Sequence, residues 1–260
     1  GQSGGGSWTV TPRTATGTTS GPLVNGPAYS FTVRATVGAW ESLGVTVGLT
    51  PDCTPSFVAS SAVATGPSSG AFGVTVPAAT QVGDVMLVIV GSFATSGGTP
   101  SGWTLVRRVQ APSLGSGDSA NDASVFARVA VAGDAGTTFA FPVNSNSSGV
   151  AAMVVYRGAS LPVHAHSGAP YPLSYSPTAP SLSTTVAGAR LVALYDHEHG
   201  GTWTAPTGMT TRVAGNGASA AHAVLIADEV RAATGATGAR TAGMSDYDDG
   251  VGFLVALLPA

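Results

Sequence analysis

The chain has 260 residues, of which 43% are hydrophobic and only 9% are charged, and its formal net charge is −3. This length suffices for one or two domains with a sizeable core. The ten basic residues are all arginine, and such a balance lacks the basic footprint of a nucleic-acid-binding protein. No apolar run reaches the roughly 18 residues that a membrane helix needs, so we expect no membrane insertion. The single cysteine, Cys53, excludes an internal disulfide, and we interpret it as incidental.

Glycine and proline punctuate the chain almost every ten residues. The 36 Gly and 17 Pro residues separate short segments rich in Val, Thr, Ser and Ala. This spacing is typical of short strands joined by turns in an all-β sandwich or barrel. The first six residues, Gly-Gln-Ser-Gly-Gly-Gly, are typical of a flexible linker rather than of a secretory leader.

The first fifty residues predict three strands, at 8–12, 29–36 and 43–49. In the second of these, Tyr29, Phe31 and Val33 alternate with polar residues, which predicts one buried face. Residues 25–36, Asn-Gly-Pro-Ala-Tyr-Ser-Phe-Thr-Val-Arg-Ala-Thr, resemble the second half of a fibronectin type III domain. The resemblance implies a partial Ig-like sandwich over residues 1–50, with Tyr29 as a tyrosine corner.

A Pro-rich turn at residues 51–55 marks the expected domain boundary, with a linker over residues 51–68. The second domain, residues 69–260, then shows an internal duplication of about 69–158 and 182–260. Three glycines of the first copy recur at a nearly constant offset in the second: Gly83, Gly102 and Gly149 correspond to Gly188, Gly208 and Gly250. The pattern predicts a duplicated β unit.

Twelve strands are predicted in this second domain, which fits a jelly-roll-like β-sandwich. They lie at 70–76, 84–92, 103–109, 124–131, 137–141 and 149–157, and then at 182–186, 190–195, 209–213, 221–230, 239–242 and 250–258. The Gly-Trp-Thr turn at 102–104, the turn at 132–136 and the exit at 156–158 resemble a module of phage tail fibres and minor tail proteins. The resemblance implies a virion surface location, virion and host-glycan partners, and a homo-oligomer, with a trimer favoured.

Two groups of polar residues are candidate metal ligands. His197 and His199, and likewise His164 and His166, are spaced to share one face of a strand, and imidazole pairs suit a transition metal. The alternative is that these histidines lie in solvated loops.

Asp246, Asp248 and Asp249 form the second group, which resembles a calcium loop in ligand type. The group lacks the closing Glu of a full twelve-residue loop. An acidic hairpin turn is therefore the alternative. The expectation is no obligatory cofactor, with Ca²⁺ or a transition metal as the candidates.

No nucleophile-and-base motif or lysine-containing phosphate loop is readable, so we expect a protein that is not an enzyme. Tyr171, Tyr175 and Trp203 are the candidate ligand contacts, because the first two lie in a Pro-rich segment where exposed aromatics often meet partners. Packing of this segment onto the sandwich is the alternative. The function expected is host-surface attachment by a tail fibre or minor tail protein. A capsid decoration or head fibre protein, and a secreted carbohydrate-binding module, are the alternatives.

Overall fold

The structure, a computed structural model, describes residues 29–34, 36–37, 39–49, 54–66, 70–93, 97–112, 120–144 and 148–260. The chain divides into two compact units, Gly1–Asp52 and Cys53–Ala260. This division falls within residues 51–55, the segment that the sequence analysis gave as the expected domain boundary. Throughout the described residues the regular structure is antiparallel β-sheet, which confirms the expected all-β class, and one short 3-10 turn (Ala218–Ala220) interrupts it.

The first unit contains two antiparallel strand pairs. Strand β1 (Tyr29–Val33) pairs with β4 (Val45–Leu49), and β2 (Thr36–Val37) pairs with β3 (Trp40–Glu41). The strands predicted at 29–36 and 43–49 are therefore confirmed. The strand predicted at 8–12 and the side chain of Tyr29 lie outside the described residues, so the tyrosine corner and the fibronectin likeness stay predictions.

The second unit contains two five-stranded sheets, and each is made from one copy of the duplication. The first sheet has the order β5-β11-β7-β9-β8, and the second has the order β12-β22-β15-β18-β17. The first comprises β5 (Ser56–Ser60), β7 (Val85–Ser92), β8 (Thr104–Ala111), β9 (Asn121–Val129) and β11 (Gly149–Arg157). The second comprises β12 (Ala165–Ser174), β15 (Ala189–His197), β17 (Thr210–Asn216), β18 (Ala223–Arg231) and β22 (Asp248–Leu257).

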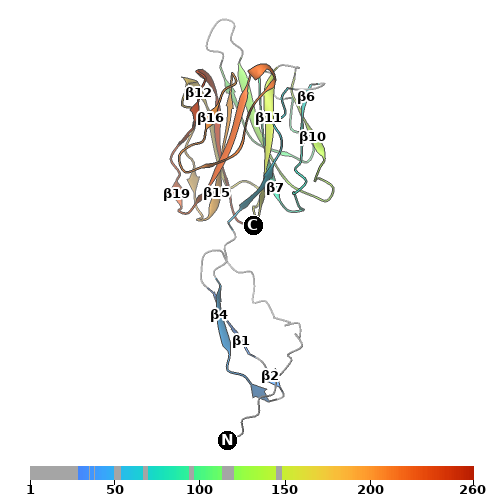
Figure 1. The fold of residues 1–260 in the computed structure, drawn as a ribbon, viewed down its shortest axis with the longest axis vertical. Helices are drawn as coiled ribbons and strands as arrows, with labels where there is room; N and C mark the ends of the chain where they lie inside the picture. The colour runs from blue at the N-terminus through green and yellow to red at the C-terminus, as the bar shows by residue number, and fades with distance from the viewer. Residues whose placement is uncertain are drawn as a thin grey trace. The chain divides into compact units, whose positions relative to one another are not determined.

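Shorter strands cover the outer face of each sheet. In the first copy these are β6 (Ala71–Thr75) and β10 (Thr138–Pro142), which pair with each other. In the second copy they are β13 (Thr178–Ala179), β14 (Ser183–Thr184), β16 (Trp203–Thr204), β19 (Gly235–Ala236), β20 (Arg240–Thr241) and β21 (Gly243–Met244). Figure 1 shows the long strands running roughly side by side between these shorter outer strands.

The long strands carry apolar side chains on both faces, and each face packs against a different core. In β7, Val85, Leu87 and Ile89 pack into a core between the two sheets, whereas Met86 and Val88 pack against the outer strands. The second sheet repeats the pattern: Val192 and Leu194 of β15 face the core between the sheets, whereas Leu191, Ala193 and Tyr195 face outward. Because successive side chains point to opposite faces, an all-apolar strand needs a cover on each side. Unit 2 is therefore two sandwiches joined face to face.

The contacts between the sheets follow a twofold relation between the copies. Strand β8 packs beside β12 and β5 beside β17, while β11 packs against β18 and β9 against β22. Strand β7 meets its own counterpart, β15, as strands on a twofold axis must. The duplicated halves thus pack like the subunits of an isologous dimer.

A buried ionic cluster joins the two sheets at one end of the core between them. The Tyr156 hydroxyl of the first copy donates a 2.8 Å hydrogen bond to Asp228 of the second, and Asp228 also holds Arg190 and Arg212. Burial raises the pKa of the Tyr156 phenol well above its usual value, and the Asp228 carboxylate raises it further. The phenol therefore stays protonated and donates to the carboxylate.

Two strands lie in segments for which the sequence predicted no strand. The expected linker 51–68 contains β5, which pairs with β11, and the Pro-rich stretch after the first copy is β12, which pairs with β22. Proline lacks a backbone N–H donor, so Pro170 and Pro172 argued against a strand in this segment. The structure accommodates both because β12 lies at the edge of its sheet. The second copy therefore begins at about residue 165 rather than 182.

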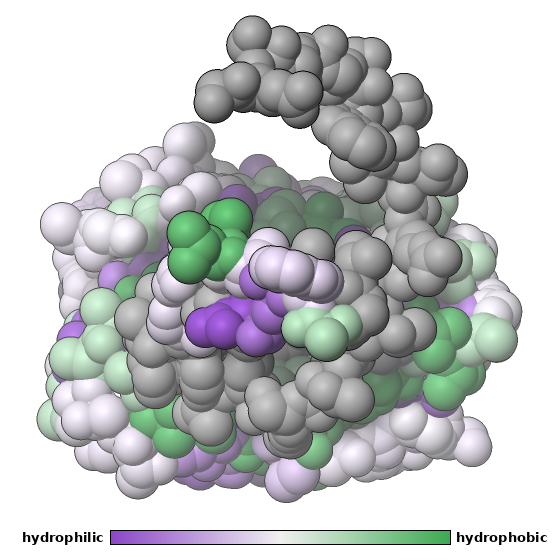
Figure 2. Space-filling view, turned by 90° about the horizontal axis from the view of Figure 1, so that it is seen from below, coloured by the Kyte–Doolittle hydropathy of each residue, from purple (hydrophilic) through white to green (hydrophobic). Residues whose placement is uncertain are grey.

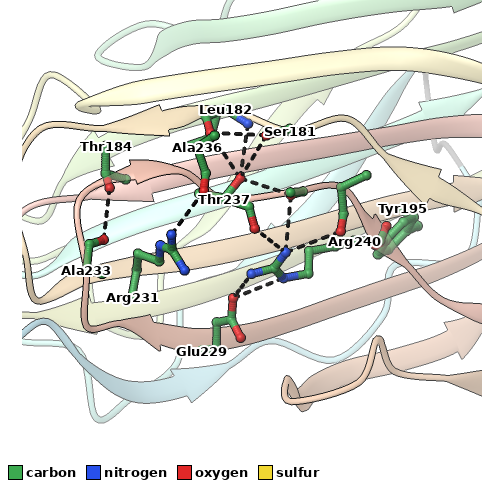
Figure 3. Close-up of polar contacts among 12 residues, drawn as sticks. Ser181, Leu182, Thr184, Tyr195, Glu229, Arg231, Ala233, Ala236, Thr237 and Arg240 are labelled. Atoms are coloured by element: carbon green, nitrogen blue, oxygen red, sulfur yellow. Dashed lines mark hydrogen bonds and ion pairs between the residues drawn. The ribbon is translucent and has the colours of Figure 1, made fainter.

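Polar contacts hold the outer strands of the second copy (Figure 3). Arg240 donates to the Glu229 carboxylate of the sheet and to the Thr237 carbonyl, and the Thr237 hydroxyl donates to the Leu182 carbonyl. The Tyr195 hydroxyl donates to the Arg240 carbonyl at 2.6 Å. These bonds attach short strands that have few ladder bonds of their own.

Charged residues make up 9% of the chain. On the face shown in Figure 2, many of the coloured residues are pale, with smaller strongly hydrophilic (purple) and hydrophobic (green) patches among them. Among the described residues no helix is long and apolar enough to cross a membrane.

Candidate metal-binding and contact site

The polar residues singled out in the second copy meet where β15 ends and β22 begins. His197 pairs with Gly250 in the antiparallel register, so Glu198 and His199 lie across from Asp249 and Asp248. Since β22 runs toward the C-terminus, at the lower edge of the second unit in Figure 1, its first residues lie at the opposite edge of that unit. The register thus brings two candidate groups, far apart in the chain, to one place.

An outer group consists of His199, Asp246 and Asp248. One ligand atom from each lies within 4.8 Å of the other two. His199 Nδ1 contacts Asp248 Oδ2, and the His199 side chain is 62% exposed. Asp248 Oδ1 accepts a 2.9 Å bond from the backbone N–H of Asp249, which fixes its orientation. The group combines two carboxylates with an imidazole at the surface.

An inner group consists of Glu198, Asp248 and Asp249, and it shares Asp248 with the outer group. Their carboxylate oxygens also lie within 4.8 Å of one another, although Glu198 and Asp249 are only 2% and 1% exposed. The backbone N–H of Glu198 donates to the Asp249 carbonyl at 3.0 Å, so the two strands hold this spacing. The junction of β15 and β22 thus gathers three carboxylate side chains, two of them buried.

His197 lies buried beside these carboxylates. The Tyr171 hydroxyl donates to the Asp196 carbonyl at 2.9 Å and lies 3.1 Å from His197 Nδ1. Because that hydroxyl proton is already used, Nδ1 carries the imidazole proton and donates to the Tyr171 oxygen. Nε2 is then the basic nitrogen, and it has no partner among the described residues. Burial lowers the pKa of His197, while the carboxylates of Asp248, Asp196 and Asp246 raise it.

A second polar cluster lies at this end of the core between the sheets. Asp196 accepts from His222 Nδ1 at 3.1 Å, both side chains are 0% exposed, and the Phe93 ring lies 4.3 Å from the His222 ring. The Asp196 carboxylate rests on Gly91, where an added methyl would lie 2.0 Å from its Cγ. Gly91 and Asp196 occupy corresponding positions of β7 and β15. The Asp196 side chain therefore fits at this position of β15 because β7 has Gly91, without a side chain, at the corresponding position.

Two exposed tyrosines border the outer group. The rings of Tyr175 and Tyr247 lie 5.0 Å apart, and the residues are 57% and 52% exposed. Tyr247 stands between Asp246 and Asp248 in the chain, so the ring pair and the outer group share one loop. Tyr175 follows β12, and its carbonyl accepts from the backbone N–H of Met244 at 2.9 Å.

The structure separates the other predicted residues from this site or buries them. Tyr171, expected as an exposed contact, is only 5% exposed, because its ring packs under Gly250 and its hydroxyl bonds inside. Trp203 is half-buried and packs on Tyr195 and His197, so it belongs to the outer core of the second copy. Among the three candidates only Tyr175 is an exposed aromatic ring.

The expected His164–His166 metal pair does not form part of either group. His164 Nε2 accepts from the backbone N–H of Thr185 at 3.0 Å. His166 instead lines a separate cleft of about 450 Å³ with Leu105 and Val163. Likewise, the structure places His197 and His199 in different surroundings, one buried and one exposed.

Sequence reasoning missed Glu198 as a candidate ligand, as well as His222 and Tyr247. A usable signal was present: Asp196 and Glu198 continue the face of Val192 and Leu194, and polar residues on an apolar face mark a special site.

Comparisons with known proteins do not supply a function. No protein-family model matches the chain, and no curated protein or solved structure matches it. The site's own geometry therefore has to carry the functional argument.

Proposed function

We propose that the chain is a non-enzymatic surface protein that attaches to host-cell glycans, as a phage tail fibre or minor tail protein does. The observation that carries the proposal is the exposed Tyr175–Tyr247 ring pair. Tyrosine presents a broad apolar face and a polar hydroxyl, which suits the C–H faces and hydroxyls of a sugar ring. Leu173, 44% exposed on the same stretch of chain, adds apolar surface.

A rigid support favours this role. The segment before Tyr175 is held in register against β22, and the Ser174 hydroxyl accepts from the backbone N–H of Ser176 at 2.8 Å. Aromatic side chains on ordered backbone lose little conformational freedom on binding. A shallow site of this kind binds a single glycan weakly, so we expect display on an oligomer, with a trimer favoured, to supply avidity.

The buried polar residues support a role without catalysis. Asp196 and His222 have the acid–imidazole arrangement found in hydrolases. Both are 0% exposed, and the His222 ring packs on Phe93, so a substrate has no access to the imidazole in this conformation. Their role is to fill the polar end of the core between the sheets.

Glycan-array binding of the full chain tests the proposal. We expect Tyr175→Ala and Tyr247→Ala each to cost more than about 1 kcal/mol, roughly fivefold in Kd, as contact anchors do. The matched control is Trp40→Ala, which removes an 84% exposed ring from the other unit and should leave binding unchanged. Equal binding by all three variants would contradict the proposal, as would the absence of any glycan ligand for the wild type.

The oligomeric state supplies a second check. Light scattering of the full chain should give a trimer. A monomer that still binds glycan would favour a secreted carbohydrate-binding module, and a monomer that does not would remove the avidity argument.

A further inference from the structure

We infer that a cleft between the two sheets binds a small carboxylic acid with an apolar body. The cleft, which we call the seam cleft, lies where β8, at the edge of the first sheet, packs beside β12, at the edge of the second. Residues 104–106, Ala127, residues 161–163 and His166 line it, and its volume is about 450 Å³. Pockets that hold small ligands measure roughly 300–1,000 Å³. This inference does not rest on the proposed glycan attachment.

The registers of the two sheets match residues of the seam cleft with residues of the second copy. Strand β8 pairs with β9, and β17 pairs with β18, each with one bulge in its register. The bulge residues are Val106 and Arg212, so these two correspond. The residues two positions before each bulge face Ala127 and Asp228, which therefore also correspond.

The second copy fills the space that the first copy leaves open. At the seam of β5 and β17, Asp228 pairs with Arg212, and Arg212 Cζ lies 4.4 Å from the centre of the Phe57 ring. Ala127 and Val106 carry neither the charged groups nor the length of their counterparts. The seam cleft therefore exists because two large polar side chains of one copy are small and apolar in the other.

Most of the lining is apolar, which selects the body of the ligand. Val106, Leu161 and Val163 are partly buried against the core between the sheets, so they form the floor of the cleft. Leu105 also lines it and is 42% exposed. A ligand that covers this concave apolar surface removes it from water, which favours binding.

The polar groups of the lining select the other end of the ligand. They are the Thr104 hydroxyl and the His166 imidazole, and both can donate a hydrogen bond. Among the described residues no carboxylate lines the seam cleft. A hydrogen-bond acceptor on the ligand therefore meets donors and no like charge.

Arg107 places a fixed positive charge beside these donors. Its Nη2 donates to the Gly168 carbonyl at 2.9 Å, and its Cδ and Nε lie 2.9 Å from the position of a Cβ added to Gly168. Residues two apart in a strand share a face, so Arg107 covers the face of β12 that also carries His166. Its neighbour Arg108 pairs with Asp122, whereas Arg107 has no carboxylate partner among the described residues. A guanidinium next to an apolar cleft complements a carboxylate with an apolar body.

Calorimetric titration of the full chain with octanoate tests the inference. We expect one octanoate per chain, and octanol, which has the same carbon chain without the charge, should bind at least about fivefold more weakly. Leu105→Glu puts a carboxylate into the seam cleft and should weaken octanoate binding at least about tenfold, because like charges repel in a desolvated site. The control Val230→Glu changes a 47% exposed residue of β18 outside the lining and should bind octanoate as the wild type does.

Arg107→Gln separates the charge from the packing of the seam. The glutamine amide can still donate to a carbonyl, so the melting temperature without ligand should stay close to that of the wild type. The preference for octanoate over octanol should fall at least about fivefold, because the fixed charge is gone.

Three results would overturn the inference. They are no saturable binding of millimolar octanoate to the wild type, equal affinities of the wild type for octanoate and octanol, and an unchanged octanoate affinity in Leu105→Glu. Glycan binding is absent from this assay, so its outcome leaves the proposed attachment function to its own test.

Discussion

The contact between Gly91 and Asp196 makes the sharpest test of how the two copies fit together. A methyl group on Gly91 would lie 2.0 Å from Asp196 Cγ and 2.2 and 2.3 Å from its carboxylate oxygens. Asp196 is 0% exposed and bonded to His222, so its carboxylate cannot swing into water. Gly91→Ala must therefore either push the sheets apart or break the bond to His222.

We expect Gly91→Ala to cost about 1–3 kcal/mol, the usual range for overpacking a dense core. For a unit of the size of Cys53–Ala260, that cost lowers Tm by about 2–12 °C. Gly73→Ala is the matched control, because its added methyl would meet only a Thr138 methyl, at 3.2 Å. Differential scanning calorimetry of the three proteins measures the difference.

A double-mutant cycle isolates the contact from other effects. Asp196→Ala removes the obstacle, so Gly91→Ala should cost much less in that background than in the wild type. Additive losses, or a Gly91→Ala variant that melts with the wild type, would refute the proposed fit of the copies at the twofold axis.

Two further predictions concern the other end of the core between the sheets and the buried phenols. Tyr156→Phe removes a buried hydrogen bond to Asp228, but Arg190 and Arg212 still pair with that carboxylate. We therefore expect the free energy of unfolding, measured with urea, to fall by about 1.5 kcal/mol. The control Tyr175→Phe changes an exposed side chain and should leave this free energy unchanged. Burial raises the pKa values of Tyr156 and Tyr195, so their contribution is complete below the unfolded value of about 10 and is lost as pH rises above it. Tyrosinate absorbance of these residues should therefore develop together with loss of the β circular dichroism signal; ionisation within an intact fold would contradict the assigned burial.

Periodicity and punctuation in the chain predict much of the local structure, for a physical reason. Glycine and proline favour turns, so the apolar segments between them predicted the long strands β7, β11, β15 and β22 to within two residues. Strands apolar at successive positions, such as β7, also imply burial on both faces. The repeated glycines predicted a duplicated β unit, and the second unit contains two five-stranded sheets.

The Pro-rich strand β12 could not be predicted from the local sequence. Its prolines are unfavourable in a central strand and acceptable at an edge, and only the sheet order decides which applies. The same edge placement buried Tyr171 and left Tyr175 exposed, although the two lie four residues apart in one segment. Exposure there depended on which strand paired with the segment.

The candidate site depended still more on tertiary structure. The chain by itself determined an all-β, lightly charged protein with histidine and aspartate clusters, because composition and alternation are local properties. The antiparallel register of β15 with β22 decided that Glu198 meets Asp249, and the packing of the copies decided that Asp196 meets Gly91. Alternation tells which face of a strand is covered, but only the assembled sheets determine what covers it.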